Sequence, residues 1–131
     1  MLLYVDTSAA TKLVVEEAES APLAEHLEKA IRGGDSLISS LLLHTELHCA
    51  AHRLPEDVPA EAVAEVLAAL ALVDVERSDL TTAPLLPGQL RSADAVHLAT
   101  ALRVGADRLV TYDGELTAAA STAGIPVLAP G

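Results

Sequence analysis

The sequence predicts an α/β protein in which a central, mainly parallel sheet of about five strands lies between helices. Short, wholly apolar runs such as residues 2–5 are typical of strands that are buried on both faces of a sheet. Longer segments with apolar residues three and four positions apart separate these runs and are typical of amphipathic helices. Strands that alternate with helices favour a parallel sheet covered by helices on both sides.

The predicted elements follow one another along the chain, with turns at glycine and proline. The final strand contains proline, which is tolerated at the edge of a sheet. The predicted strands are residues 2–5, 37–39, 72–75, 109–111 and 126–128. The predicted helices are residues 7–17, 20–32 and 41–54, one that begins at Pro59, a short one within 79–88, one capped by Ser92, and 113–123.

Length and composition predict a single domain over residues 1–131, because this length suits one core. Apolar residues make up 51% of the chain and charged residues 21%, a globular and not a disordered composition. The single cysteine excludes an internal disulfide framework. The sequence shows no signal peptide and no apolar run of membrane-spanning length, so a soluble cytoplasmic protein without membrane contact is expected.

The formal net charge of −11 is the opposite of what a general nucleic-acid binder carries. Either the partner of this protein is not a nucleic acid, or its acidic groups are partly neutralised. Divalent metal ions or a basic partner protein would neutralise them.

Four acidic residues are predicted to meet at the carboxyl edge of the sheet. Asp6 directly follows the first strand and Asp113 follows the fourth, which is where parallel sheets bind ligands. Asp94 lies in the first turn of the helix that starts near Ser92. Glu46 has mostly apolar neighbours at helical spacing, so its carboxylate is predicted to face packed protein.

Each of these acids also has a purely structural interpretation. Asp6, Asp94 and Asp113 could stabilise helix N-termini, and Glu46 could pair with an arginine. Their coincidence at one edge favours a shared site instead. Because four carboxylates repel one another, a divalent cation would stabilise them together. Oxygen ligands favour Mg²⁺ or Mn²⁺ over Zn²⁺, and such a metal can activate a water for attack on a phosphodiester.

Four segments resemble the PIN domain family, and in particular the VapC toxins of bacterial toxin–antitoxin pairs. They are VDTSA, SSLLLHTEL, RSADAVHLATAL and LVTYDGELTAAASTAGIPVLAP, and the resemblance covers nearly the whole chain. The last two segments are more specific than an isolated Asp-Thr-Ser would be. The resemblance implies the three-layer PIN-like sandwich and Mg²⁺-dependent endoribonuclease activity, with Mn²⁺ as a substitute metal.

The resemblance also implies roles for individual residues. Asp6 and Asp94 match the usual direct Mg²⁺ ligands, and Ser8 and Thr111 match polar supporting positions. The catalytic acidic quartet, which is also the metal-binding set, matches Asp6, Glu46, Asp94 and Asp113. The implied partners are an RNA substrate, a cognate VapB-like antitoxin and a second copy of the chain in a homodimer.

Two other functions fit parts of the sequence. One is a non-catalytic α/β module that binds a metal or a partner. The other is a receiver-like signalling domain, which is less favoured because receivers use a lysine near the end of a late strand. The only lysines here, Lys12 and Lys29, are both early in the chain.

Histidines cluster around Glu46 but do not form the zinc-protease signature H-E-x-x-H, because Glu46 is not adjacent to the first histidine. His44, His48 and His52 share one helix face, for which solvent or partner contact is predicted and transition-metal binding is the alternative. His97 is predicted to be a packing histidine, with contact to the acidic site as the alternative.

Three further residues lie close to the acidic set in sequence. Cys49 is predicted to be a small core residue on the inward side of its helix. Lys12 and Arg91 could each contact a phosphate group or remain solvated surface charges.

Overall fold

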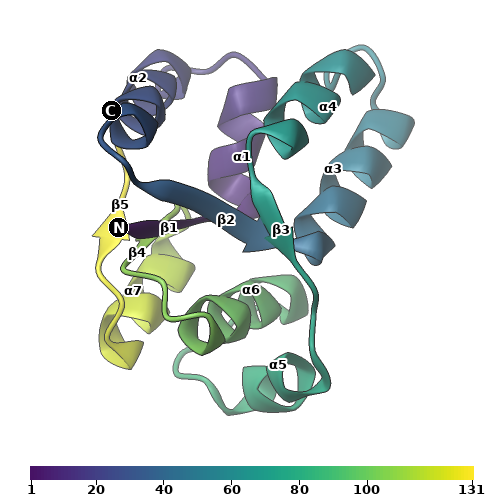
Figure 1. The fold of residues 1–131 in the computed structure, drawn as a ribbon. Coiled ribbons are helices and arrows are strands. Elements are labelled where there is room, and N and C mark those ends of the chain that lie inside the picture. The colour runs from purple at the N-terminus through teal and green to yellow at the C-terminus, as the bar shows by residue number, and fades with distance from the viewer.

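A computed structural model describes all residues from Met1 to Gly131 (Figure 1). Five parallel strands form one sheet in the order β3-β2-β1-β4-β5. The strands are β1 (Leu2–Val5), β2 (Ser36–Ser40), β3 (Ala71–Val73), β4 (Arg108–Val110) and β5 (Val127–Leu128). The helices are α1 (Thr7–Val14), α2 (Ser20–Arg32), α3 (Leu41–Arg53), α4 (Ala60–Ala68), α5 (Arg77–Thr82), α6 (Ser92–Arg103) and α7 (Gly114–Ala123), with a 3-10 turn η1 (Ala83–Leu85). The predicted fold class is therefore confirmed.

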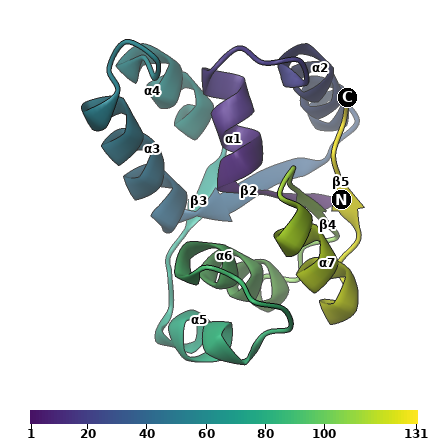
Figure 2. The same ribbon diagram turned by 180° about the vertical axis from the view of Figure 1, so that it is seen from behind.

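The sheet lies between two helical layers (Figures 1 and 2). Helices α1 to α4 cover one face, and α5 to α7 cover the other. Side chains of the central strand alternate between the layers, as expected for a strand buried on both faces. Leu3 and Val5 pack with α1 to α4, whereas Tyr4 packs with α6 and α7. No helix is both long enough and apolar enough to cross a membrane.

The helix predicted for residues 7–17 ends early, at Val14. The hydroxyl of Ser20 donates to the carbonyl of Val15 at 3.1 Å and accepts from the N–H of Glu17 at 2.8 Å. These bonds close a turn between α1 and α2, so α1 cannot extend to residue 17. The prediction that Ser92 caps its helix is also wrong, because Arg91 occupies the cap position and makes no side-chain capping bond.

Cys49 is exposed, so the prediction of a core position is wrong. The buried residues of α3 are Leu43 and Leu47. Cys49 comes two positions after Leu47, which places it about 200° around the helix from that buried side. The apolar neighbours of Glu46 suggest a broad inward face, but the buried stripe on α3 is narrower.

The strand order creates a topological switch point at β1. The chain runs from β1 to β2 and then to β3 on one side, and later returns to place β4 on the other side of β1. The helix after β1, α1, therefore lies on one face of the sheet, and the helix after β4, α7, lies on the other. In open parallel sheets this is where ligands bind.

Candidate metal centre

Asp6 directly follows β1 and is the N-cap of α1. Its Oδ1 accepts hydrogen bonds from the backbone N–H of Ala9 at 3.1 Å and from the hydroxyl of Ser8 at 2.8 Å. Its Oδ2 accepts from the hydroxyl of Thr111 at 2.8 Å. The residue is 1% exposed, so these bonds fix the orientation of a buried carboxylate.

Ser8 and Thr111, the predicted supporting residues, tie the start of α1 to the end of β4. Their hydroxyl oxygens lie 3.1 Å apart. The backbone N–H of Tyr112 donates to Ser8 Oγ at 2.9 Å, and that of Asp113 donates to Thr111 Oγ at 3.1 Å. The two hydroxyls thus hold the backbone that leads into Asp113 in a fixed position beside Asp6.

Asp113 and Asp94 are both half-buried and stand at the starts of helices. Asp113 is the N-cap of α7, and its Oδ1 accepts from the N–H of Leu116 at 2.8 Å. Asp94 lies in the first turn of α6 and accepts no hydrogen bond within the chain. The capping interpretation therefore holds for Asp6 and Asp113 but leaves the carboxylate of Asp94 without a partner.

The four acids lie within electrostatic range of one another. The pKa of Asp94 is raised, first by burial and then by the negative charges of Asp113, Asp6 and Glu46, while His97 opposes the shift. Burial also raises the pKa of Asp6, although its hydrogen bonds favour the ionised form. Burial is the first cause of both raised pKa values, and for Asp94 the neighbouring carboxylates add to it.

Glu46 belongs to a partly buried hydrogen-bonded chain and does not pair with an arginine. Its Oε1 accepts from the hydroxyl of Thr7 at 2.9 Å and lies 2.6 Å from Nε2 of His97. Nδ1 of His97 lies 2.7 Å from the hydroxyl of Tyr4. Burial raises the pKa of Tyr4, so the phenol keeps its proton, and its hydroxyl can either donate to Nδ1 or accept from it.

His97 is 1% exposed, so it is a packing histidine as predicted, and it also makes the alternative contact with an acid of the site. Tyr4 and Thr7 were not among the predicted site residues, yet both belong to this network. Tyr4 did carry a signal, because it stands in an otherwise aliphatic strand and a buried tyrosine hydroxyl requires a hydrogen-bond partner.

The donor set fits a hard divalent cation. No three His, Cys, Asp or Glu side chains are placed to hold a metal ion among them directly. Mg²⁺ commonly binds through one or two carboxylates and keeps several waters, so it does not require three such ligands. Asp94 offers both carboxylate oxygens, and Asp113 Oδ2 accepts no hydrogen bond within the chain. The oxygen-only chemistry of the acids suits Mg²⁺ or Mn²⁺.

The two candidate phosphate-binding side chains differ in their surroundings. Lys12 forms ion pairs with Glu17 at 2.8 Å and Glu19 at 3.0 Å, and its ammonium lies 4.9 Å from the ring centroid of Tyr112. Arg91 is exposed, precedes α6, and forms no ion pair within the chain. Arg91 is therefore the basic side chain near Asp94 that is free to contact a ligand.

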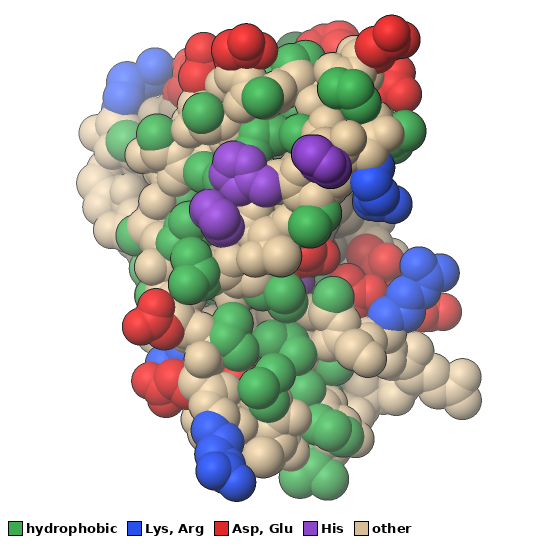
Figure 3. All heavy atoms as spheres, turned by 90° about the vertical axis from the view of Figure 1, so that its right-hand side faces the viewer, with side chains coloured by type: hydrophobic (Ala, Val, Ile, Leu, Met, Phe, Trp, Pro, Cys, Tyr) green, Lys and Arg blue, Asp and Glu red, His purple; other side chains and the backbone are tan.

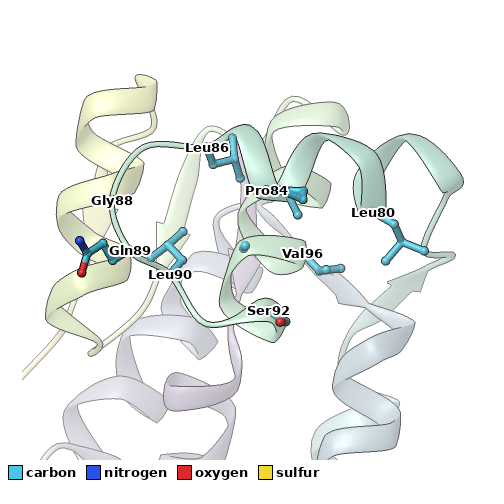
Figure 4. Close-up of a pocket in the computed structure, with 10 residues that line it drawn as sticks. Leu80, Pro84, Leu86, Gly88, Gln89, Leu90, Ser92 and Val96 are labelled. Atoms are coloured by element: carbon cyan, nitrogen blue, oxygen red, sulfur yellow. The ribbon is translucent and has the colours of Figure 1, made fainter.

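A separate pocket of about 410 Å³, with a mixed polar and apolar lining, lies beside the start of α6 (Figure 4). Leu80 of α5, the loop through Leu86 and Leu90, and Ser92 and Val96 of α6 line it. None of the four acids does. The acidic site and the pocket thus share α6 but offer different chemistry.

Comparisons with known proteins agree with this architecture. Residues 3–121 match the PIN domain family. The chain is 41% identical to ribonuclease VapC46 of Mycobacterium tuberculosis over 131 residues, covering 98% of this chain and 97% of that protein. It is 30% identical to ribonuclease VapC47 of the same species over 133 residues, covering 99% and 98%.

Solved structures show the same fold. VapBC2 of Rickettsia felis, bound to a DNA fragment from its promoter, aligns with a TM-score of 0.74 at 13% identity, covering 98% of both chains. The M. tuberculosis toxin VapC20, which cleaves the sarcin–ricin loop, aligns with a TM-score of 0.67 at 16% identity, covering 98% of this chain and 99% of that one. Family match, full-length relatives and fold together show that this chain belongs to the PIN domain family, within its VapC group.

Proposed function

We propose that this protein is a Mg²⁺-dependent endoribonuclease and the toxin of a type II toxin–antitoxin pair. The proposal is supported by the placement of four acidic residues near the switch point, where burial and then the charges of Asp113, Asp6 and Glu46 raise the pKa of Asp94. Full-length relatives that are named ribonucleases support RNA as the substrate class. Mn²⁺ is expected to substitute for Mg²⁺.

Each acid has a distinct role in this proposal. Asp6 and Asp94 would hold the cation, with Asp113 completing the acidic wall. Glu46, held by Thr7 and His97, would accept a hydrogen bond from the attacking water and so orient it. A bound divalent cation would supply a nucleophile at neutral pH and stabilise the negative charge that builds on the phosphate.

Asp94→Asn gives the cleanest test of this function. The change keeps the shape of the side chain and breaks no hydrogen bond within the chain, so the variant should fold. We expect RNA cleavage in Mg²⁺ to fall by about a hundredfold or more. Asp57→Asn is the matched control, because Asp57 is an exposed acid in a turn away from the site. Robust cleavage by a folded Asp94→Asn variant would contradict the proposed role.

Asp6→Asn should abolish cleavage as well, but it needs a check of folding. The amide nitrogen that this change introduces cannot accept a hydrogen bond, so one of the bonds that the buried carboxylate now accepts would be lost. Circular dichroism and urea unfolding of the variant therefore accompany its cleavage assay.

We further propose a basic, VapB-like antitoxin as partner and a homodimer as the working form. Solved neighbours that are toxin–antitoxin complexes support the antitoxin partner, including one from Klebsiella pneumoniae and FitAcB from Neisseria gonorrhoeae. The net charge of −11 suits a partner segment rich in Lys and Arg. Co-purification with the product of the adjacent gene tests the pairing, and free protein should cleave RNA that the complex leaves intact.

A non-catalytic metal- or partner-binding module is the alternative function. Isothermal titration of the folded protein with Mg²⁺ and Mn²⁺ separates the two. Absence of binding at millimolar metal, together with no RNA cleavage, would favour the non-catalytic module.

A further inference from the structure

The outer face of α3 carries exposed histidines that the proposed nuclease chemistry does not use (Figure 3). His44 and His48 lie one turn apart, with ring centroids 4.4 Å apart and ring planes inclined by 60°. Neither ring makes a hydrogen bond or an ion pair within the chain. Two unpaired imidazoles are thus held side by side by the backbone of a single helix.

This arrangement suits a transition-metal ion. Imidazole nitrogen is a preferred ligand of Zn²⁺, Ni²⁺ and Cu²⁺, and residues four apart on a helix lie on the same face. Metal–nitrogen bonds of about 2.0–2.1 Å require two ring nitrogens roughly 3 Å apart. Rings that are already neighbours can reach this separation by rotating their side chains, without any movement of the backbone. We infer that His44 and His48 form a bidentate site for a divalent transition-metal ion.

The site is distinct from the acidic centre, although both use α3. Glu46 lies between the two histidines in sequence but points to the other side of the helix, where it contacts Thr7 and His97. The acidic centre offers oxygen ligands, which suit Mg²⁺, whereas the histidine pair offers nitrogen ligands. Excess Mg²⁺ is therefore expected to fill the acidic centre and to leave the histidine pair available, an expectation that rests on the proposed function.

The histidine pair provides two ligands and leaves the other coordination positions to water. No third His, Cys, Asp or Glu is placed to complete the site. His52 is exposed one turn further along α3, but its ring does not pack against that of His48. The site is therefore assigned to His44 and His48 alone.

Titration with Ni²⁺ in excess Mg²⁺ tests the inference. We expect one Ni²⁺ to bind per chain and the thermal unfolding midpoint to rise, because the helical state holds both rings together. His44→Ala and His48→Ala should each weaken Ni²⁺ binding by about tenfold or more. His52→Ala should bind as the parent does. So should His26→Ala, which removes an exposed histidine from α2 that has no histidine one turn away.

Electron paramagnetic resonance with Cu²⁺ gives an independent measurement. The parent should show coupling to two imidazole nitrogens, and each single variant of the pair to one. Three results would overturn the inference: parent-like Ni²⁺ affinity in His44→Ala, loss of binding in His52→Ala, or loss in Asp94→Asn. The ribonuclease proposal is tested separately, because the histidine variants are expected to cleave RNA at the parent rate.

Discussion

The four acids of the candidate centre differ in how firmly the fold holds them. Asp6 is almost fully buried, and hydrogen bonds fix both of its carboxylate oxygens. Asp94 is half-buried and has no hydrogen bond within the chain, but it experiences the charges of its neighbours. A carboxylate without local support in an acidic surrounding destabilises the fold, which is a common property of functional sites.

Asp94→Asn is therefore expected to stabilise the metal-free protein while it removes cleavage. Because the folded-state pKa of Asp94 is raised, its contribution to stability decreases as pH rises from the unfolded-state pKa through the folded-state pKa. At neutral pH the variant should gain about 0.5–1 kcal/mol, a value discounted for solvent screening of a half-exposed group. Urea unfolding against Asp57→Asn measures the gain, and a loss of stability would contradict it.

Mg²⁺ should reverse the difference in stability, so that the parent becomes more stable than Asp94→Asn. The cation binds the folded parent through its carboxylates, so millimolar Mg²⁺ should raise the thermal unfolding midpoint of the parent. The rise should be smaller for Asp94→Asn, which lacks one ligand. For Asp57→Asn it should be as large as for the parent. Equal shifts in all three proteins would place metal binding outside the acidic centre.

The buried chain from Tyr4 through His97 to Glu46 gives a prediction of its own. Tyr4→Phe removes the hydrogen-bond partner of Nδ1 of His97, so the free energy of unfolding should fall by about 1–2 kcal/mol and Glu46 should be less well oriented. Cleavage should fall as well. Tyr112→Phe is the control, because that hydroxyl donates to the carbonyl of Pro130, and its loss should leave the cleavage rate unchanged.

At the scale of elements, one ion pair joins the short helix α5 to α6. Arg103 of α6 donates to both carboxylate oxygens of Asp79, at 2.7 and 3.0 Å, and to the carbonyl of Asp74 at 3.0 Å. Asp79 is 1% exposed. Burial acts to raise its pKa, but the bonds and charge of Arg103, with the N–H of Glu76, lower the pKa overall.

Asp79→Asn should lower the free energy of unfolding by about 2–3 kcal/mol at neutral pH, because Arg103 loses its buried partner. A lowered folded-state pKa means that the ionised carboxylate contributes stability above its unfolded-state pKa. This contribution is lost as pH falls through the folded-state pKa. The difference between parent and variant should therefore shrink in acid. Urea unfolding at neutral and acidic pH measures it, and a difference independent of pH would show that the ion pair is not its source.

The elements also show what local sequence predicts and what it does not. The apolar run before Asp6 correctly predicted β1, and Gly124 correctly predicted the end of α7. Both signals are local in the sequence. The cap predicted at Ser92 is one residue too late, because neighbouring residues compete for that position. The burial of Asp79 could not be predicted, because its partner Arg103 is 24 residues away in sequence.

For the site, the positions of Asp6 and Asp113 at strand ends followed from the parallel topology, as did their nearness to each other. The contact between His97 and Glu46 required tertiary structure, because the two residues lie on different helices. Cys49 was wrongly predicted to lie in the core from a local pattern. The apolar residues of α3 suggest a wider buried stripe than the helix has.

At the scale of the whole molecule, the net charge of −11 constrains how RNA can bind. A surface with few free basic side chains can neutralise few phosphates, so the affinity should depend only weakly on salt. Arg91 is one of these free basic side chains. Arg91→Ala should therefore reduce the slope of log affinity against log salt concentration by about one. RNA titrations of the inactive Asp94→Asn protein measure it. Arg32→Ala, an exposed change on α2, should leave the slope unchanged, and a steep slope in all variants would contradict the prediction.

The strand order has a consequence for the synthesis of the protein on the ribosome. β1 is the first strand to leave the ribosome, yet its neighbour β4 comes from residues 108–110. Thr111 and Asp113, which stand beside Asp6, follow even later. A growing chain therefore carries only part of its acidic set until translation is nearly finished. The acidic centre therefore becomes complete only when synthesis of the chain is almost finished, since Asp113 and the Thr111 hydroxyl that supports Asp6 come from its last part.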